Sequence, residues 1–446
     1  MLIEYKVKNF MSYKDEIVLS MVADKNRELA ETNIFEHGNM RLLKTAAIFG
    51  ANASGKTNLI ESMNFLSHLM KSRMDVKESF SEIPNFRLDN ESRKKPISYE
   101  ISFFLDEQRH RYGLTLDKDG ICEEWLYFVP KRQEACYFER KGNNITHIGT
   151  YFEDKKALDY IKPDSYRPFL YTLGQESIKQ FQWAKLILRY LKFNIKSSNI
   201  PDAIFRQMIE EEIMDDTDEK TIYKEEIISI LKDADVGISD LSVVKEVKSA
   251  EEKEMLSHII GILQKQGQEG EFVEQNENYE TLMHHLKYDD DKNQIGEERF
   301  PLKIESRGTV KLYALQYPLL NVLKRGGILL IDEIETSLHP LLCEKIINLF
   351  NNKSTNPKNA QLIFTTHNTL LMNPKLLRRD QILFTEKDQY GVSSLYSLYD
   401  IDLKVRNNFN YLNNYLSGRF GAIPYLGSFF INSEKLEDIA DETKTE

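Results

Sequence analysis

A glycine-rich loop carrying a lysine and a threonine is the segment of this sequence best equipped for chemistry. Residues 50–57 read GANASGKT and fit the pattern GxxxxGK(S/T) in full. In this pattern backbone N–H groups curl around the β- and γ-phosphates of a nucleotide, while Lys56 neutralises their charge and the Thr57 hydroxyl binds Mg²⁺. The loop lies between an apolar run and an amphipathic segment, where a new helix would point its positive end at the phosphates. We therefore predict that ATP and Mg²⁺ bind here, in contact with Gly50, Asn52, Ser54, Gly55, Lys56, Thr57 and Asn58.

A second group of candidate residues follows an apolar run much later in the chain. Residues 327–333 read GILLIDE, so that four aliphatic side chains precede two acids. In an open α/β sheet a buried strand delivers the next residue to the carboxyl edge, where ligands bind. Asp332 would hold Mg²⁺ through water, and Glu333 would polarise the water that attacks the γ-phosphate. Such acid pairs are common, and it is the glycine loop upstream that favours the catalytic interpretation.

His367 is a third candidate. It follows the run QLIFTT at residues 361–366, again at the expected carboxyl edge of a strand. A lone histidine in such a place is more often structural than functional. Next to the other two groups, it becomes a candidate sensor of the γ-phosphate.

The elements that must position these groups follow from the apolar periodicity. In the first part of the chain we expect strands over 2–10, 16–22 and 45–49, a helix with Leu59, Met63, Leu66 and Met70 on one face, and antiparallel strands over 98–150. After Phe300 we expect helices over 310–324 and 341–352, alternating with strands over 328–332 and 361–366. Such alternation is typical of an α/β sheet.

The middle of the chain differs in composition and charge. Residues 201–300 hold 27 acidic and 11 basic side chains, a balance of −16 in a chain whose net charge is −11, which leaves +5 for the rest. The pattern is mainly helical from about 176 to 266, and 267–299 is polar with at most one strand. An acidic surface repels a phosphate backbone, so any nucleic-acid contact is expected elsewhere. A solvated helical surface is the simpler interpretation.

These patterns predict an α/β protein in which a P-loop head is divided by an insertion. We place the N-terminal half of the head at 1–185, the acidic and mainly helical insertion at 186–299, and the C-terminal half at 300–446. No run of about eighteen apolar residues occurs, and charges alternate with apolar residues at the start of the chain. The three cysteines have unrelated spacings. We therefore expect a cytoplasmic protein with free thiols and no membrane contact.

The order of the motifs resembles the ABC-type ATPase head, in particular the heads related to SMC proteins, RecF and the OLD-type ATPases. More narrowly, the chain is similar to AAA-domain ATPases of prokaryotic phage-defence and abortive-infection systems, a group that includes RloA-like proteins and the AriA subunit of PARIS. The resemblance covers both α/β halves and is weak across the insertion. The segments that carry it are KNFMSYKDEIVLSM, FGANASGKTNLIESM, ESRGTVKL, LLIDEIETSLHP, QLIFTTHN and YLSGRFGAIP.

The resemblance implies roles for further residues. Residues 305–309 would form the signature loop, in which Ser306 and the backbone of Gly308 would reach the γ-phosphate of ATP held by another subunit. Residues 337–339 would form the D-loop at that dimer interface, and Gln175 would be the Q-loop glutamine that contacts nucleotide and Mg²⁺. The working unit would then be an ATP-dependent dimer or higher homo-oligomer. Ser306 is also open to interpretation as an ordinary helix N-cap.

Some features depart from the relatives named above. Family members often carry arginine where this chain has Met11, and the signature loop lacks the double glycine of transporters. OLD-type nucleases add a metal-dependent TOPRIM domain after the ATPase, whereas fewer than twenty residues follow Gly427 here. The acidic run 289–291 is expected to be a solvated turn rather than a metal site. We therefore expect the effector to be a separate protein.

Several functions from different classes fit these observations. The leading hypothesis is an ATP-binding and hydrolysing switch or scaffold subunit of an anti-phage defence complex, which controls a separately encoded effector such as a TOPRIM nuclease. The alternative is a DNA-binding repair ATPase of the SMC or RecF kind, although no platform of aromatic and arginine residues stands out. A module that binds ATP without hydrolysing it is a third possibility. An ABC transporter subunit ranks below these because of its different signature loop.

Overall fold

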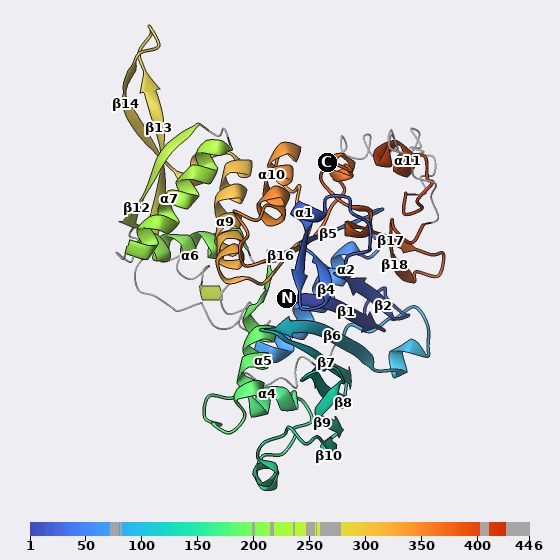
Figure 1. Ribbon diagram of the computed structural model, residues 1–446. Helices are drawn as coiled ribbons and strands as arrows, with labels where there is room; N and C mark the ends of the chain where they lie inside the picture. Colours follow the sequence, from blue (N-terminus) through green and yellow to red (C-terminus); the bar gives the residue numbers. More distant parts are fainter. Residues whose placement is uncertain are drawn as a thin grey trace, which may run out of the picture.

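The computed structural model describes residues 1–71, 80, 83–198, 201–214, 218–234, 237–246, 255, 257–258, 278–401 and 410–424. Two large sheets lie beside each other, and a three-stranded sheet projects from one end of the molecule (Figure 1). The helices are α1 (Ala30–Asn33), α2 (Lys56–Lys71), α4 (Phe169–Leu173), α5 (Gln182–Phe193), α6 (Asp202–Met214), α7 (Asp218–Asp233), α9 (Arg307–Arg325), α10 (Pro340–Asn351) and α11 (Tyr411–Leu416).

A six-stranded sheet combines strands from the two ends of the chain. Its order is β11 (Ile195–Ser197), β15 (Ile328–Ile331), β16 (Gln361–Thr365), β5 (Thr45–Gly50), β17 (Ile382–Lys387) and β18 (Ser393–Ser397). Neighbouring strands are parallel except for β17 and β18. The strand that leads into the glycine loop thus lies between two strands from the far end of the chain. This arrangement confirms the expected α/β P-loop head assembled from N- and C-terminal halves.

The central strands are apolar on both faces because each face covers a different core. On β5, Ala46 and Ile48 pack into one core with α2, α5 and the antiparallel sheet. Ala47 and Phe49 point the other way, into a core shared with α9 and α10. Parallel strands covered on both faces appear in a sequence as continuous apolar runs, which is why β5, β15 and β16 could be predicted.

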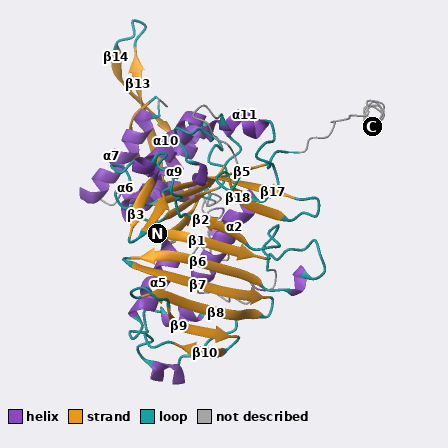
Figure 2. Cartoon of the chain, turned by 45° about the vertical axis from the view of Figure 1, so that its right-hand side comes forward, coloured by secondary structure: helices purple, strands orange, loops and turns teal. Residues whose placement is uncertain are grey.

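A seven-stranded antiparallel sheet lies against the first of these cores, and Figure 2 shows its strands in succession. Its order is β10 (Asn144–Ile148), β9 (Ala135–Lys141), β8 (Gly120–Val129), β7 (Gln108–Asp117), β6 (Ile97–Leu105), β1 (Leu2–Lys8) and β2 (Ile17–Ser20). Burial alternates along β6, as the polar and apolar alternation predicts for a half-buried sheet. The small hairpin of β3 (Ile34–His37) and β4 (Met40–Leu43) was not predicted.

The projecting arm contains strands as well as the expected helices. Its described part holds α6, α7 and a three-stranded antiparallel sheet of β12 (Ile238–Glu246), β13 (Asn278–Tyr288) and β14 (Gln294–Pro301) (Figure 1). The prediction of at most one strand in 267–299 is therefore wrong. Every residue of β14 except the last is exposed, so the apolar alternation that would reveal a strand is missing.

One boundary of the sequence-based division lies inside a helix. The boundary expected at residue 185 falls inside α5, which packs against α2 and leads directly into β11 of the parallel sheet. In the structure the projecting arm begins with α6.

The thiols of Cys122, Cys136 and Cys343 are free.

Candidate nucleotide-binding site

The glycine loop begins at the carboxyl end of β5 and ends where α2 starts at Lys56. Two glycines of the loop occupy positions where a residue with a Cβ would be strained. Gly50 has a φ of 154°, and a Cβ added there would lie 2.4 Å from the carbonyl oxygen of Thr385. Gly55 has a φ of 119°, and its Cβ would lie 2.7 Å from Ser393 Oγ. The pattern therefore needs glycine at both positions for steric as well as conformational reasons.

The loop is held from the other end of the chain by hydroxyl groups on β17 and β18. Ser54 Oγ and Thr385 Oγ1 are 2.6 Å apart, and Ser393 Oγ donates to the carbonyl of Ser54 at 2.6 Å. Ser54, Thr385 and Ser393 are all buried. Sequence reasoning missed Thr385 and Ser393, because the contact exists only when β17 pairs with β5.

The turn between β1 and β2 holds the same loop from a second side. Tyr13 donates its hydroxyl to the carbonyl of Gly55 at 2.9 Å, and Asn58 Nδ2 donates to Ser12 Oγ at 2.7 Å. Met11, which stands where relatives often carry arginine, is 38% exposed in this turn with a φ of 47°. The N-terminal turn is thus part of the site, although its role in holding the loop was not predicted.

Lys56 lies buried against the inside of the loop. Its Nζ donates to the carbonyls of Gly50 and Ala51, at 3.0 Å each. Burial lowers the pKa of Lys56, and the nearby carboxylates of Glu333 and Asp332 partly offset that shift. The structure therefore brings the loop lysine into the electrostatic range of both predicted acids.

Asp332 and Glu333 follow directly from β15, and one threonine of β16 holds both. Thr365 Oγ1 donates to Asp332 Oδ1 at 2.5 Å and accepts the backbone N–H of Glu333 at 2.7 Å. Glu333 has a φ of 52°, which costs a residue with a Cβ about 1–2 kcal/mol. The hydrogen bond from its backbone keeps Glu333 in this conformation, and its carboxylate is 51% exposed.

His367 follows the neighbouring strand and lies beside Glu333. Its Nε2 is 3.8 Å from Glu333 Oε1, so the two side chains share the same exposed edge of the sheet. Its backbone N–H donates to Glu335 Oε1 at 2.5 Å, while Thr366 Oγ1 donates to the other oxygen of Glu335 at 2.7 Å. Glu335 was not among the predicted residues, yet it fixes the strand end that carries His367.

The oxygen donors at this edge suit Mg²⁺. The metal prefers one or two carboxylates together with phosphate oxygens and water. Asp332 is partly exposed at the end of β15, and the Thr57 hydroxyl lies exposed in the first turn of α2. These two residues would hold the ion, which would neutralise charge on the phosphates. Asn52 is also exposed on the loop.

The predicted signature loop lies against the predicted D-loop of the same chain. A Cβ on Gly308 would be 2.8 Å from the carbonyl oxygen of Ser337, which has a φ of 63°. Ser306 caps α9, and its Oγ accepts the backbone N–H of Thr309 at 3.1 Å. The simpler interpretation of Ser306 as an N-cap therefore describes its contact within the chain, and a contact to nucleotide of another subunit stays a prediction.

Gln175 is not brought to this site. Its Nε2 donates to the carbonyl of Tyr171 at 2.9 Å, and the residue lines a cavity together with Gly327, which precedes β15. Asp332 follows the same strand, so Gln175 lies at the amino edge of the sheet and the acids at the carboxyl edge. The segment stays there because α4, just before it, is tied to the antiparallel sheet: Glu124 of β8 accepts the backbone N–H of Phe169 at 2.7 Å. The Q-loop assignment is corrected accordingly.

The acidic run 289–291 lies outside the candidate nucleotide site. Residues 289–291 form the exposed turn between β13 and β14, as expected. Within the described ranges, no three His, Cys, Asp or Glu side chains are grouped so as to hold a metal ion by themselves. Across the same ranges, no helix is both long and apolar enough to cross a membrane.

Comparison with known proteins yields similar solved structures and one family match. The structure is similar to the SMC head domain from Thermotoga maritima, with 12% identity, a TM-score of 0.39, and coverage of 90% of this chain and 99% of that one. It is also similar to an SMC head bound to the C-terminal winged-helix domain of ScpA, with 14% identity, a TM-score of 0.41, and coverage of 89% and 97%. No curated protein sequence matches significantly.

The family match covers the glycine loop, the arm and all three groups of candidate residues. Residues 46–373, well over half of the chain, match the family described as "AAA domain, putative AbiEii toxin, Type IV TA system". The chain belongs to this family of AAA-domain proteins.

Proposed function

We propose that this protein is an ATP-hydrolysing switch subunit of a prokaryotic defence complex and that it controls a separately encoded effector. The observation that carries the proposal is the meeting of three separate chain segments at one sheet edge. Lys56 lies within electrostatic range of Asp332 and Glu333, and His367 lies 3.8 Å from Glu333. A phosphate-binding loop beside a partly exposed carboxylate is the arrangement that nucleotide hydrolysis requires.

Each group has a distinct role in the proposed reaction. The loop N–H groups and Lys56 hold the β- and γ-phosphates, and Asp332 with Thr57 holds Mg²⁺. Glu333 accepts a proton from water as the water oxygen bonds to the γ-phosphorus and the bond to the β,γ-bridging oxygen breaks. ADP and phosphate leave, and the proton returns to solvent. The Thr365 hydroxyl donates to Asp332 and orients its carboxylate.

The site of one chain is completed by a second copy in this proposal. Ser306 and Gly308 lie at the start of α9, where backbone N–H groups point out of the helix and suit a phosphate. In a two-fold dimer the same surface of each copy faces the other, so two composite sites form together. ATP would then hold two heads together, and hydrolysis would release them.

Control of an effector rests on the family and on the sequence resemblance. The family description names a toxin and a toxin–antitoxin system. The segments around 50–57, 305–309 and 361–368 resemble ATPases of abortive-infection systems. We propose that the ATP-bound oligomer holds the effector and that a change in its nucleotide state releases it.

Steady-state ATP turnover tests this function. Glu333→Gln keeps the size of the side chain but removes the base, so we expect turnover to fall about 10²- to 10⁴-fold while ATP still binds. The same variant is expected to accumulate as an ATP-bound oligomer in light scattering. Lys56→Ala is expected to lose both ATP binding and turnover.

Glu36→Gln is the matched control, because Glu36 is exposed on β3 in a separate two-stranded sheet. It should hydrolyse ATP like the wild type. Wild-type turnover by Glu333→Gln would refute the role of the base, and a strict monomer with ATP at micromolar concentration would refute the switch.

A further inference from the structure

The hairpin of β13 and β14 extends beyond the third strand of the arm, and Figure 1 shows it projecting from the rest of the molecule. The last residue pair between β12 and β13 in this direction is Ile238 with His285. Beyond that pair, residues 286–288 of β13 pair with residues 294–297 of β14 and with no other described strand. A two-stranded ribbon by itself is only marginally stable in water, so further contacts would stabilise this one.

Three large apolar side chains gather on this ribbon. Leu286, Tyr288 and Ile295 are 37%, 53% and 58% exposed. Leu286 and Tyr288 are two residues apart in β13 and therefore share a face of the sheet. Glu297 pairs directly with Leu286, and Ile295 is two residues from Glu297 in β14, so it lies on the same face. We call Leu286, Tyr288 and Ile295 the tip patch, since exposed apolar side chains that cluster mark interaction sites.

The backbone of the ribbon favours a contact through its face. The register shifts between Lys287 and Tyr288, so Ile295 is the extra residue of a bulge in β14. A bulge in an edge strand turns its edge away from a further strand. A partner would therefore contact the side chains of the tip patch rather than add a strand to the sheet.

The turn beside the tip patch is acidic. Residues 289–292 hold three acids and one base, a balance of −2. Lys287 does not offset this charge, because it pairs with Glu298 at 3.3 Å. Within the described ranges, Asp290 and Asp291 form no ion pair, and both are exposed. A partner that covers the tip patch must therefore place Lys or Arg side chains around it.

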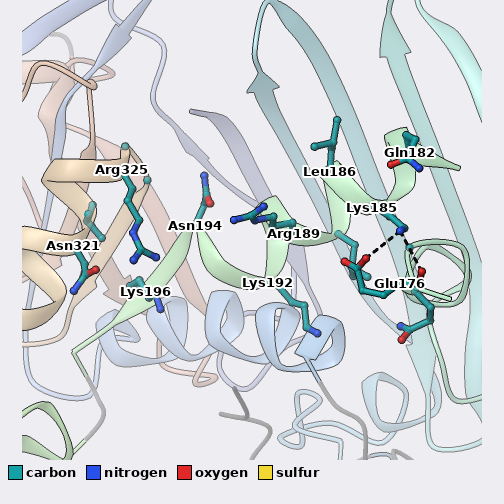
Figure 3. Close-up of a pocket in the computed structure, with 16 residues that line it drawn as sticks. Glu176, Gln182, Lys185, Leu186, Arg189, Lys192, Asn194, Lys196, Asn321 and Arg325 are labelled. Carbon is teal, nitrogen blue, oxygen red and sulfur yellow. Dashed lines mark hydrogen bonds and ion pairs between the residues drawn. The ribbon is translucent and has the colours of Figure 1, made fainter. Parts of the chain in front are cut away.

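This charge argues against other occupants. A phosphate backbone or an anionic membrane would be repelled, and so would the same tip of a second copy. A cavity with basic side chains lies between α5 and α9 of the head (Figure 3). Its Lys185 pairs with Glu176 at 3.1 Å, and Lys192 and Lys196 also have partners, so a second copy offers no free lysine there for the tip.

We propose that the tip patch is the docking site for a protein partner whose apolar pocket is rimmed by Lys and Arg. Tyr288 is the expected anchor, because a tyrosine buries a large area and loses little conformational freedom. His285, one residue before the ribbon, lies 2.8 Å from Glu305, which precedes Ser306. Docking at the tip would thus act on the start of α9. The identification of this partner as the effector rests on the proposed function, whereas the docking itself does not depend on ATP turnover.

Photocrosslinking in the native host tests the proposal with the full-length protein. The photoreactive amino acid p-benzoylphenylalanine replaces Tyr288, and the matched control carries it in place of Tyr160, a tyrosine of the head that is 66% exposed. We expect one protein to be captured from position 288 and not from position 160. The crosslinked peptide should contain apolar residues flanked by Lys or Arg.

The captured protein is then purified, and its affinity for the full-length chain is measured by calorimetry. We expect Tyr288→Ser and Asp291→Lys each to weaken binding about tenfold or more, and Tyr160→Ser to bind within about twofold of the wild type. Binding should also weaken as the salt concentration rises from about 50 to 200 mM, because screening reduces the attraction between the charges.

Capture of only a second copy or of nucleic acid would overturn the proposal, as would equal capture from the two positions. Wild-type affinity of Tyr288→Ser would overturn it as well. The tip variants should hydrolyse ATP at the wild-type rate, since the ribbon lies outside the candidate ATP site. Wild-type turnover by Glu333→Gln would therefore refute the proposed hydrolysis and leave the docking site standing.

Discussion

At the scale of single residues, the position of Glu333 is set by its backbone. A φ of 52° turns the residue out of the line of β15, and the hydroxyl of Thr365 accepts its N–H while donating to Asp332. One hydroxyl thus orients two neighbouring acids that have different proposed tasks. Thr365 is fully buried in the strand next to β15, so its position depends on the pairing of β15 with β16.

The burial of His110 predicts that the free energy of unfolding depends on pH. It is buried between the rings of Phe103 and Phe128, and burial lowers its pKa from 6.5 to about 4. Between pH 6.5 and pH 4, His110 binds a proton in the unfolded chain but not in the folded one. The free energy of unfolding therefore keeps its full value above pH 6.5 and decreases as the pH falls below it. We expect this effect to lower the free energy of unfolding by about 2 kcal/mol from pH 7 to pH 5, as measured with urea.

The variant His110→Leu should lose this part of the pH dependence, because leucine keeps the volume and cannot be protonated. His147→Leu is the control, since His147 is exposed on β10. It should follow the wild-type curve. An unchanged pH dependence in His110→Leu would contradict the assignment.

At the scale of elements, β18 holds the glycine loop in place through Ser393. Ser393 Oγ donates to the carbonyl of Ser54 at 2.6 Å and lies 2.8 Å from Ser12 Oγ. Its removal leaves buried polar groups unpaired, at a cost of about 1–3 kcal/mol. We therefore expect Ser393→Ala to lower the free energy of unfolding by that amount and to weaken the binding of labelled ATP several-fold.

Ser394 provides a matched control for the contact that Ser393 makes with the glycine loop. Ser394 lies next to Ser393 in β18, but its side chain is exposed. Ser394→Ala should bind ATP as the wild type does. If the two variants bind ATP equally well, the loop does not depend on β18.

The arm is joined to the head at the predicted signature loop. His285 Nε2 of β13 lies 2.8 Å from Glu305 Oε1, one residue before Ser306. Thr281 of the same strand donates to Glu210 of α6 at 2.9 Å and lies 3.0 Å from the hydroxyl of Tyr313 in α9. A displacement of the arm would therefore act directly on the start of α9.

At the scale of the whole molecule, the proposed composite site can be tested by mixing two inactive proteins. Lys56→Ala damages the loop side of a site, and Ser306→Glu damages the signature side by placing a carboxylate at the exposed start of α9, where phosphate would lie. In a mixed two-fold dimer one site receives both intact halves, and the other receives both damaged halves. Random mixing gives half mixed dimers, so ATP turnover should recover to about a quarter of the wild-type value.

Each variant alone is the control and should show only background turnover. A mixture that stays as inactive as its components would show that each chain builds its site alone. The result distinguishes composite sites from mere association, because chains that pair without sharing sites would also remain inactive.

The local features of the site were open to prediction from the sequence. The glycine loop, the acids after β15 and His367 are set by short-range rules, because a continuous apolar run marks a buried parallel strand and its last residue marks the ligand-binding edge. The order of these segments also predicted a head divided by an insertion. Polar alternation predicted most of the antiparallel sheet, since one face of it is buried.

The long-range features required the tertiary structure. Strand order depends on pairing across more than 300 residues, and only that pairing places Thr385 and Ser393 on the glycine loop. Gln175 was misplaced because its sequence position says nothing about which edge of the sheet it reaches. Strand β14 was missed because an exposed strand has no apolar period. The tip patch combines β13 and β14, so it exists only once these strands pair.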